Sequence, residues 1–211
     1  MIDVAIFPIP GSVNFPGVPC PLHVFEPRYR KMVRFCLDNQ ALMGVCHTEK
    51  ILHANEREQN IQEALNSNQA TYKPCTIFSA GPVSLLEELP DGRMVIEVDT
   101  SIRLRLHNEV QTLPFSIWSC EEWPDQPLTA AEMEDLELGK QKILQRLLVL
   151  THSNPQLQAI LKDRQWQTMA ARQFSFCVMG LIGLDSSVKQ QLLEMTSPAQ
   201  RLTSVLQLLN R

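Results

Sequence analysis

The chain has 211 residues, of which 44% are apolar and 20% charged, and its net charge is −4. This length suits one large domain or two small ones, and the composition excludes the disordered and fibrous classes. Residues 1–125 hold 10 Lys+Arg against 16 Asp+Glu, and residues 126–211 hold 9 against 7. Neither part has the clustered basic residues that binding to a phosphate backbone needs, so no nucleic-acid partner is expected.

The N-terminus and the cysteines indicate a cytoplasmic protein. Met1 leads directly into a β-type run, with neither the basic segment nor the cleavage site of a signal peptide. The longest apolar run, Phe176 to Leu184, is far shorter than a membrane span, so no membrane partner is expected. The six cysteines are scattered without a CxxC pair, which predicts reduced, buried thiols, no metal site and no cofactor.

The first 125 residues are predicted to form mainly short strands. Val4 to Ile9 reads as a strand, and the proline- and glycine-rich stretch after it, through Pro21, reads as a loop. A helix is predicted over 27–38, because Glu26 suits the N-cap and Pro27 the first helical position. Its apolar face is made by residues at helical spacing: Tyr29, Met32, Val33, Cys36 and Leu37.

A polar stretch separates this helix from a run of strands. Ala41 to His47 reads as a buried strand, and residues 49–72 as a long excursion with at most a short helix near 61–65. Leu89 to Gly92 is predicted to be a tight turn, because Pro90 presets its first corner and Asp91-Gly92 tolerates left-handed positions. Further strands of an antiparallel meander are predicted at 76–80, 83–88, 94–98, 102–106 and 115–123.

The pattern becomes helical after residues 124–127. Thr129 and Glu132 form a capping box, and Ser197 followed by Pro198 opens the last helix. Helices are predicted at about 129–151, 155–162, 166–181, 185–195 and 198–210, with 166–181 at the centre. The sequence therefore predicts an α+β protein with two parts, a β-barrel-like subdomain over 1–124 and a bundle of about five helices over 125–211.

Motifs that carry catalysis are missing from the sequence. There is no P-loop, no GxGxxG, no HExxH and no GxSxG, and the five histidines are spread along the chain. No catalytic residue is therefore assigned, and the protein is predicted not to be an enzyme. A hydrolase whose nucleophile and base meet only in the folded chain is the less favoured alternative.

The runs FPIP at 7–10, NFPG at 14–17 and PLHVFEPRYRKMV at 21–33 closely resemble the opening of one family, the N-terminal domain of Lon proteases. LPDGR at 89–93 is similar to a hairpin of the family, and LLEM at 192–195, followed by Arg201-Leu202, is similar to its ending. The resemblance covers nearly the whole chain, and it implies a PUA-like β-barrel followed by a helical bundle.

The same resemblance implies a binding role. In the family this domain recognises substrate polypeptides, often unfolded ones, and sometimes self-associates. The ATPase and the Ser-Lys peptidase of Lon have no counterpart in these 211 residues, so any delivery of substrates would involve a separate protease or chaperone partner. Because related PUA-type barrels bind RNA, an RNA-binding protein is the alternative reading.

The expected binding site is an apolar groove with a charged rim. Its predicted residues come from the proline-rich stretch, the helix start and the hairpin: Phe15, Pro16, Leu22, Phe25, Glu26, Arg28, Tyr29, Leu89 and Arg93. The same residues also have a purely structural interpretation, in which Glu26 to Arg30 is simply a well-capped start of an amphipathic helix, with an ion pair between Glu26 and Arg30.

Overall fold

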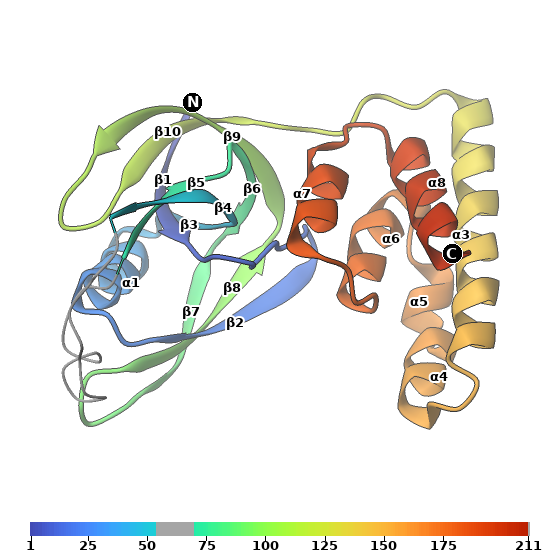
Figure 1. Ribbon diagram of the computed structural model, residues 1–211, viewed down its shortest axis with the longest axis horizontal. Helices are drawn as coiled ribbons and strands as arrows, with labels where there is room; N and C mark the ends of the chain where they lie inside the picture. The colour runs from blue at the N-terminus through green and yellow to red at the C-terminus, as the bar shows by residue number, and fades with distance from the viewer. Residues whose placement is uncertain (54–69, 211) are drawn as a thin grey trace. The chain divides into compact units, whose positions relative to one another are not determined.

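The computed structural model describes residues 1–53 and 70–210, and its contacts divide the chain into two units (Figure 1). The first unit comprises Met1–Pro124 together with Leu184–Leu193, and the second comprises Asp125–Gly183 together with Glu194–Arg211. The segment Leu184–Leu193, which the sequence places in the helical bundle, thus groups with the first unit. No helix within the described ranges is both long and apolar enough to cross a membrane.

A closed barrel forms the centre of the first unit, with strand order β1-β10-β9-β6-β3. Its strands are β1 (Ile2–Pro8), β3 (Leu42–Cys46), β6 (Ile77–Gly81), β9 (Ile102–Gln111) and β10 (Ile117–Glu122). All neighbouring pairs are antiparallel except β1 and β3, which are parallel. Every strand contributes to one buried cluster, which includes Val4, Ile6, Cys46, Phe78, Leu104 and Cys120. The barrel and the helices after it confirm the predicted α+β class.

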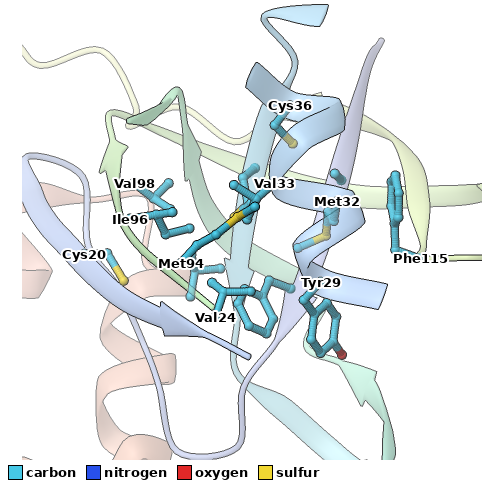
Figure 2. Close-up of a cluster of buried hydrophobic side chains, with 14 of the residues drawn as sticks. Cys20, Val24, Tyr29, Met32, Val33, Cys36, Met94, Ile96, Val98 and Phe115 are labelled. Carbon is cyan, nitrogen blue, oxygen red and sulfur yellow. The ribbon is translucent and has the colours of Figure 1, made fainter. Parts of the chain in front are cut away.

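A second core packs helix α1 (Pro27–Asn39) and a three-stranded sheet against other residues of the barrel strands. The sheet has the order β2-β8-β7, with β2 (Val18–Val24), β7 (Val83–Glu88) and β8 (Met94–Thr100). Figure 2 shows the buried side chains of α1 among those of β2 and β8: Tyr29, Met32, Val33 and Cys36 with Cys20, Val24, Met94, Ile96 and Val98. The amphipathic face predicted for this helix is therefore its core face.

Strand β2 corrects the predicted loop. Residues 18–24 pair antiparallel with β8 along their whole length, although Pro19 and Pro21 cannot donate to a ladder. β2 is an edge strand, and the N–H of Asp99, the residue opposite Pro19, points away from β2, to the carbonyl of Pro82 just before β7. In an antiparallel pair, hydrogen-bonded and non-hydrogen-bonded residue pairs alternate. Pro19 and Pro21 occupy positions of the second kind, where no N–H donor is needed.

The first unit also contains a separate pair of strands and the predicted tight turn. β4 (Thr48–His53) and β5 (Thr71–Pro74) form an antiparallel pair, so the predicted excursion begins and ends in strands; the helix expected near 61–65 lies outside the described residues. The tight turn is present where predicted, with the Gly92 N–H donating to the Leu89 carbonyl at 2.8 Å. Gly92 has φ +82°, a conformation that favours glycine.

Helix α7 (Ser186–Glu194) belongs to the first unit through hydrogen bonds to the barrel strands. The buried Gln190 donates from Nε2 to the Ile77 carbonyl at 2.8 Å, and Arg103 donates to the Leu193 carbonyl at 2.6 Å. These bonds join α7 to β6 and β9. A helical pattern alone could not show this pairing, because it joins segments about 90 to 113 residues apart.

The second unit is helical. Its elements are α3 (Ala130–Leu150), α4 (Pro155–Lys162), α5 (Arg164–Thr168), α6 (Ala171–Cys177), the 3₁₀ turn η1 (Val178–Gly180) and α8 (Pro198–Leu209). The capping box of α3 is present as predicted: the Glu132 N–H donates to Thr129 Oγ1, and the Glu132 carboxylate accepts from the Thr129 N–H. Ser197 caps α8, because its hydroxyl oxygen accepts a hydrogen bond from the Gln200 N–H.

The long helix predicted over 166–181 is wrong. Met169 and Ala170 are extended, with ψ of 134° and 136°, and they separate α5 from α6. Lys140 of α3 is 3% exposed, and its ammonium donates to the carbonyls of Gln167 and Met169 at 2.9 and 2.7 Å. The break presents these two carbonyls to a buried cation, which needs such acceptors.

A second buried cation organises the unit. Arg201 of α8 is fully buried and forms a two-pronged ion pair with Asp125, at 3.2 and 2.9 Å. It also donates to Ser175 Oγ and to the Met195 carbonyl, and its guanidinium lies 3.7 Å from the ring centre of Phe176. One side chain thereby joins the start of the unit to α6 and α8.

Candidate functional site

The first turn of α1 is held to β5 by an arginine. Arg28 forms an ion pair with Glu26 at 2.9 Å and donates to the Ala70 carbonyl at 2.8 Å and to Thr71 Oγ1 at 3.3 Å. Glu26 is the N-cap residue, but its side chain makes no capping hydrogen bond. The ion pair predicted between Glu26 and Arg30 is replaced by the one between Glu26 and Arg28. Arg28 is therefore a local clamp whose charge is already balanced.

Tyr29 lies at the edge of the second core. Its ring is 4.2 Å from that of Phe7, and Figure 2 shows its oxygen directed away from the cluster. Burial raises the pKa of Tyr29 to about 12, an effect that the nearby Arg28 charge partly opposes. The phenol therefore stays protonated at neutral pH, and within the described residues it makes no hydrogen bond.

A cavity of about 500 Å³ opens beside this helix start. Its walls come from β1, α1, the β4–β5 pair and the connection between β9 and β10: Ile6, Pro8, Arg28, Tyr29, Leu52, residues 71–74, Glu109, residues 112–116 and Trp118. Most of these side chains are apolar or aromatic. A cavity of this size and lining is typical of a ligand pocket.

The polar groups around the cavity are mostly paired with one another. Lys73 pairs with Glu49 at 2.5 Å, and the Ser116 hydroxyl donates to Glu109 at 2.6 Å. Since Arg28 is also paired, none of these groups needs a charged ligand. The arrangement suits an apolar side chain in the middle, with the tyrosine hydroxyls available to a bound backbone.

The predicted site residues do not form one surface. Of the nine, Arg28 and Tyr29 line the cavity, next to Glu26. Phe15 is 3% exposed, and its carbonyl accepts from the buried Thr100 hydroxyl, so its ring belongs to the interior. The remaining residues are half-buried at other places: Pro16 in the turn before β2, Leu22 on β2, Phe25 before α1, and Leu89 and Arg93 at the ends of the β7–β8 turn.

The other cavity walls are hardly predictable from sequence patterns. Leu52 and Tyr72 lie in the polar stretch 49–72, and Leu113 lies between two predicted strands. The pairing of β4 with β5 and of β9 with β10 gives these residues their places in the cavity wall. One signal was available: the apolar run Leu113-Pro114-Phe115 interrupts a hairpin, and Leu113 is 80% exposed. An exposed leucine of this kind in a loop is a hint of a contact surface.

Within the described ranges, no group of three or more His, Cys, Asp or Glu side chains is placed to hold a metal. All six cysteines are buried and unpaired with one another. Burial raises the pKa of the Cys20 thiol to about 11 and those of Cys36 and Cys120 to about 12. Thiols with such pKa values are poor nucleophiles at neutral pH.

The cysteines make one prediction testable without a ligand. At pH 8 the native chain should react slowly with a thiol reagent, and the urea-unfolded chain quickly at all six positions. Because the folded-state pKa values are raised, their stabilising effect is full below the ordinary thiol pKa and is lost as the pH rises through about 11 to 12. Rapid native labelling at pH 8 would contradict this burial.

Comparisons with known proteins identify a family and a shared fold. A family model described as the ATP-dependent protease La (LON) substrate-binding domain matches residues 3–211. The N-terminal domain of a Mycobacterium avium complex Lon protease superposes with a TM-score of 0.68 at 11% identity, covering 99% of this chain and 98% of that one. A Lon N-terminal domain protein from Xanthomonas campestris gives 0.59 at 19% identity, covering 98% of each chain. At these identities the two structures establish a shared fold.

Proposed function

Since the chain belongs to the family of LON substrate-binding domains, we propose that it binds extended segments of unfolded polypeptides in the cavity beside α1. The domain acts by binding, without catalysis of its own. A substrate-binding domain needs a surface that accepts many sequences. Apolar contacts, together with hydroxyl groups that can form hydrogen bonds to the backbone of the bound segment, provide such a surface.

The observation that carries the proposal is the apolar cavity with an already paired polar rim. Seating one bulky apolar side chain removes its surface from water, at roughly 25 cal/mol per Å². An unfolded segment exposes such side chains, whereas a folded protein hides them. The cavity therefore distinguishes unfolded from folded chains by what is accessible.

Two neighbouring residues of β4 offer a matched test. Leu52 lines the cavity and is 47% exposed, whereas Ile51 is 58% exposed and does not line it. Leu52→Asp should weaken binding of a labelled, permanently unfolded polypeptide about tenfold, because a charge faces the apolar segment. Ile51→Asp should leave the affinity unchanged. Fluorescence anisotropy gives both constants, with circular dichroism to check the fold.

A second pair extends the test to the other wall. Leu113 lines the cavity, and Val110, which is 51% exposed on β9, does not. Leu113→Asp should weaken binding as Leu52→Asp does, and Val110→Asp should not. Equal losses in all four variants, or no saturable binding by the unmodified protein at high micromolar concentration, would rule out the cavity as the binding site.

A further inference from the structure

Two smaller hollows continue from the cavity along the exposed side of α1. The middle hollow, of about 390 Å³, is lined by Pro27, Arg28, Lys31, Leu113 and Pro114, and shares Arg28, Leu113 and Pro114 with the cavity. The basic hollow, of about 190 Å³, is lined by Pro27, Arg30, Lys31, Arg34 and Gly92, and shares Pro27 and Lys31 with the middle one. The three hollows form one groove along the first two turns of α1.

The two ends of the groove differ in charge. Arg34 is paired with Glu88 at 2.6 Å, and Arg28 with Glu26. Arg30 donates to the Asp91 backbone carbonyl at 3.1 Å and has no carboxylate partner within the described residues. Lys31 is exposed and makes no ion pair in this part of the chain. Among the described residues, the groove therefore ends in two cations without a carboxylate partner, in a unit whose overall charge is negative.

We propose that the groove selects extended polypeptide segments in which a bulky apolar residue is accompanied by acidic residues. The apolar residue occupies the cavity, and a carboxylate two to four positions away pairs with Lys31 and Arg30. This inference rests on the proposed function and specifies its substrate class. The unpaired cations supply the charge complementarity, which sets specificity more than affinity.

The spacing follows from the helix. Lys31 lies three residues after Arg28, which is about 5 Å along the axis of an α-helix. A lysine side chain adds several ångströms of reach, and an extended peptide advances about 3.3 Å per residue. An anchor in the cavity thus places residues two to four positions away, in either chain direction, near the ammonium and guanidinium groups.

The test uses labelled nonapeptides that are symmetric, so that their direction does not matter. Each has Leu-Phe-Leu at its centre and one Ser on each side, and ends in pairs of Asp, Lys or Ser. The Asp peptide should bind about fivefold more tightly than the Lys peptide at low salt, with the difference shrinking in high salt. Lys31→Glu combined with Arg30→Glu should reverse the order.

The control variant changes the net charge by the same amount at two positions far from the groove in the sequence. Lys142→Glu combined with Lys162→Glu, both at exposed helix positions in the second unit, should keep the preference for the Asp peptide. Equal binding of the three peptides would overturn the selectivity and leave the proposed function standing. Binding of none, under conditions where an unfolded apolar polypeptide also fails to bind, would overturn both. Tighter binding of a labelled single-stranded RNA than of any peptide would assign the basic hollow to a different ligand.

Discussion

Replacing Arg201 by Met is expected to lower the free energy of unfolding by about 3 to 5 kcal/mol. Arg201 is fully buried, and its partner Asp125 has a side chain that is only 4% exposed. Removing the guanidinium leaves a buried carboxylate without its cation, and leaves the Met195 carbonyl without this donor. In urea unfolding followed by tryptophan fluorescence, the midpoint should fall by about 1.5 to 3 M.

The double variant separates the ion pair from simple loss of packing. Combining Arg201→Met with Asp125→Leu removes both charges, and should recover a substantial part of the lost stability. Arg146→Met is the matched control, because Arg146 is half-buried and donates from Nε to the Leu209 carbonyl at 3.1 Å. It should cost about 1 kcal/mol. A double variant as unstable as the sum of the two single variants would show that the pair is not coupled.

Gly81→Ala is expected to cost about 3 kcal/mol or more. A Cβ built on Gly81 would lie 1.7 Å from the Asp99 carbonyl oxygen, and 2.5 Å from its carbon. Both atoms belong to the backbone of β8, so no side chain can turn away, and the strands themselves have to separate. Thermal unfolding should show a drop in Tm of about 6 to 12 °C or more.

The same substitution at Gly139 should have the opposite sign. Gly139 lies inside α3, and the nearest atom to its added Cβ is Leu202 Cδ1 at 3.6 Å, an ordinary contact. Alanine is favoured over glycine in a helix by about 0.5 to 1 kcal/mol. Gly139→Ala should therefore raise Tm slightly. If Gly81→Ala were equally harmless, β6 and β8 would have more room than the structure gives them.

Much of the fold could be predicted from local patterns. The apolar face of α1, the turn ending at Gly92 and the capping box at Thr129 were read correctly, because each depends on residues a few positions apart. The run of short strands predicts a barrel-like subdomain, and the family resemblance adds the PUA-like type of that barrel. The domain border near residue 124 follows from the change in periodicity, although Leu184–Leu193 returns to the first unit.

The errors arose where distant groups decide the outcome. Pro19 and Pro21 read as loop residues, but an edge strand tolerates them at positions where the ladder needs no N–H donor. The break at Met169 depends on the ammonium of Lys140, 29 positions away. For the candidate site, the sequence marked Arg28 and Tyr29, whereas the opposite walls at Leu52 and Leu113 come from strand pairing. Contact of the nine predicted residues with a polypeptide stays a prediction.

The discontinuous first unit has a consequence for synthesis on the ribosome. β1 pairs with β10, and in this pair Ile2 lies opposite Cys120. At a synthesis rate of about 5 to 20 residues per second, Cys120 is added roughly 6 to 24 s after Ile2. Helix α7 is translated later still. Its Gln190 and Leu193 then form hydrogen bonds with Ile77 and Arg103 of the barrel strands. One edge of β1 therefore stays unpaired until residue 120 has been made, whereas its other edge can pair with β3 once residues 42–46 have emerged. The unpaired edge is available to nascent-chain chaperones during that interval.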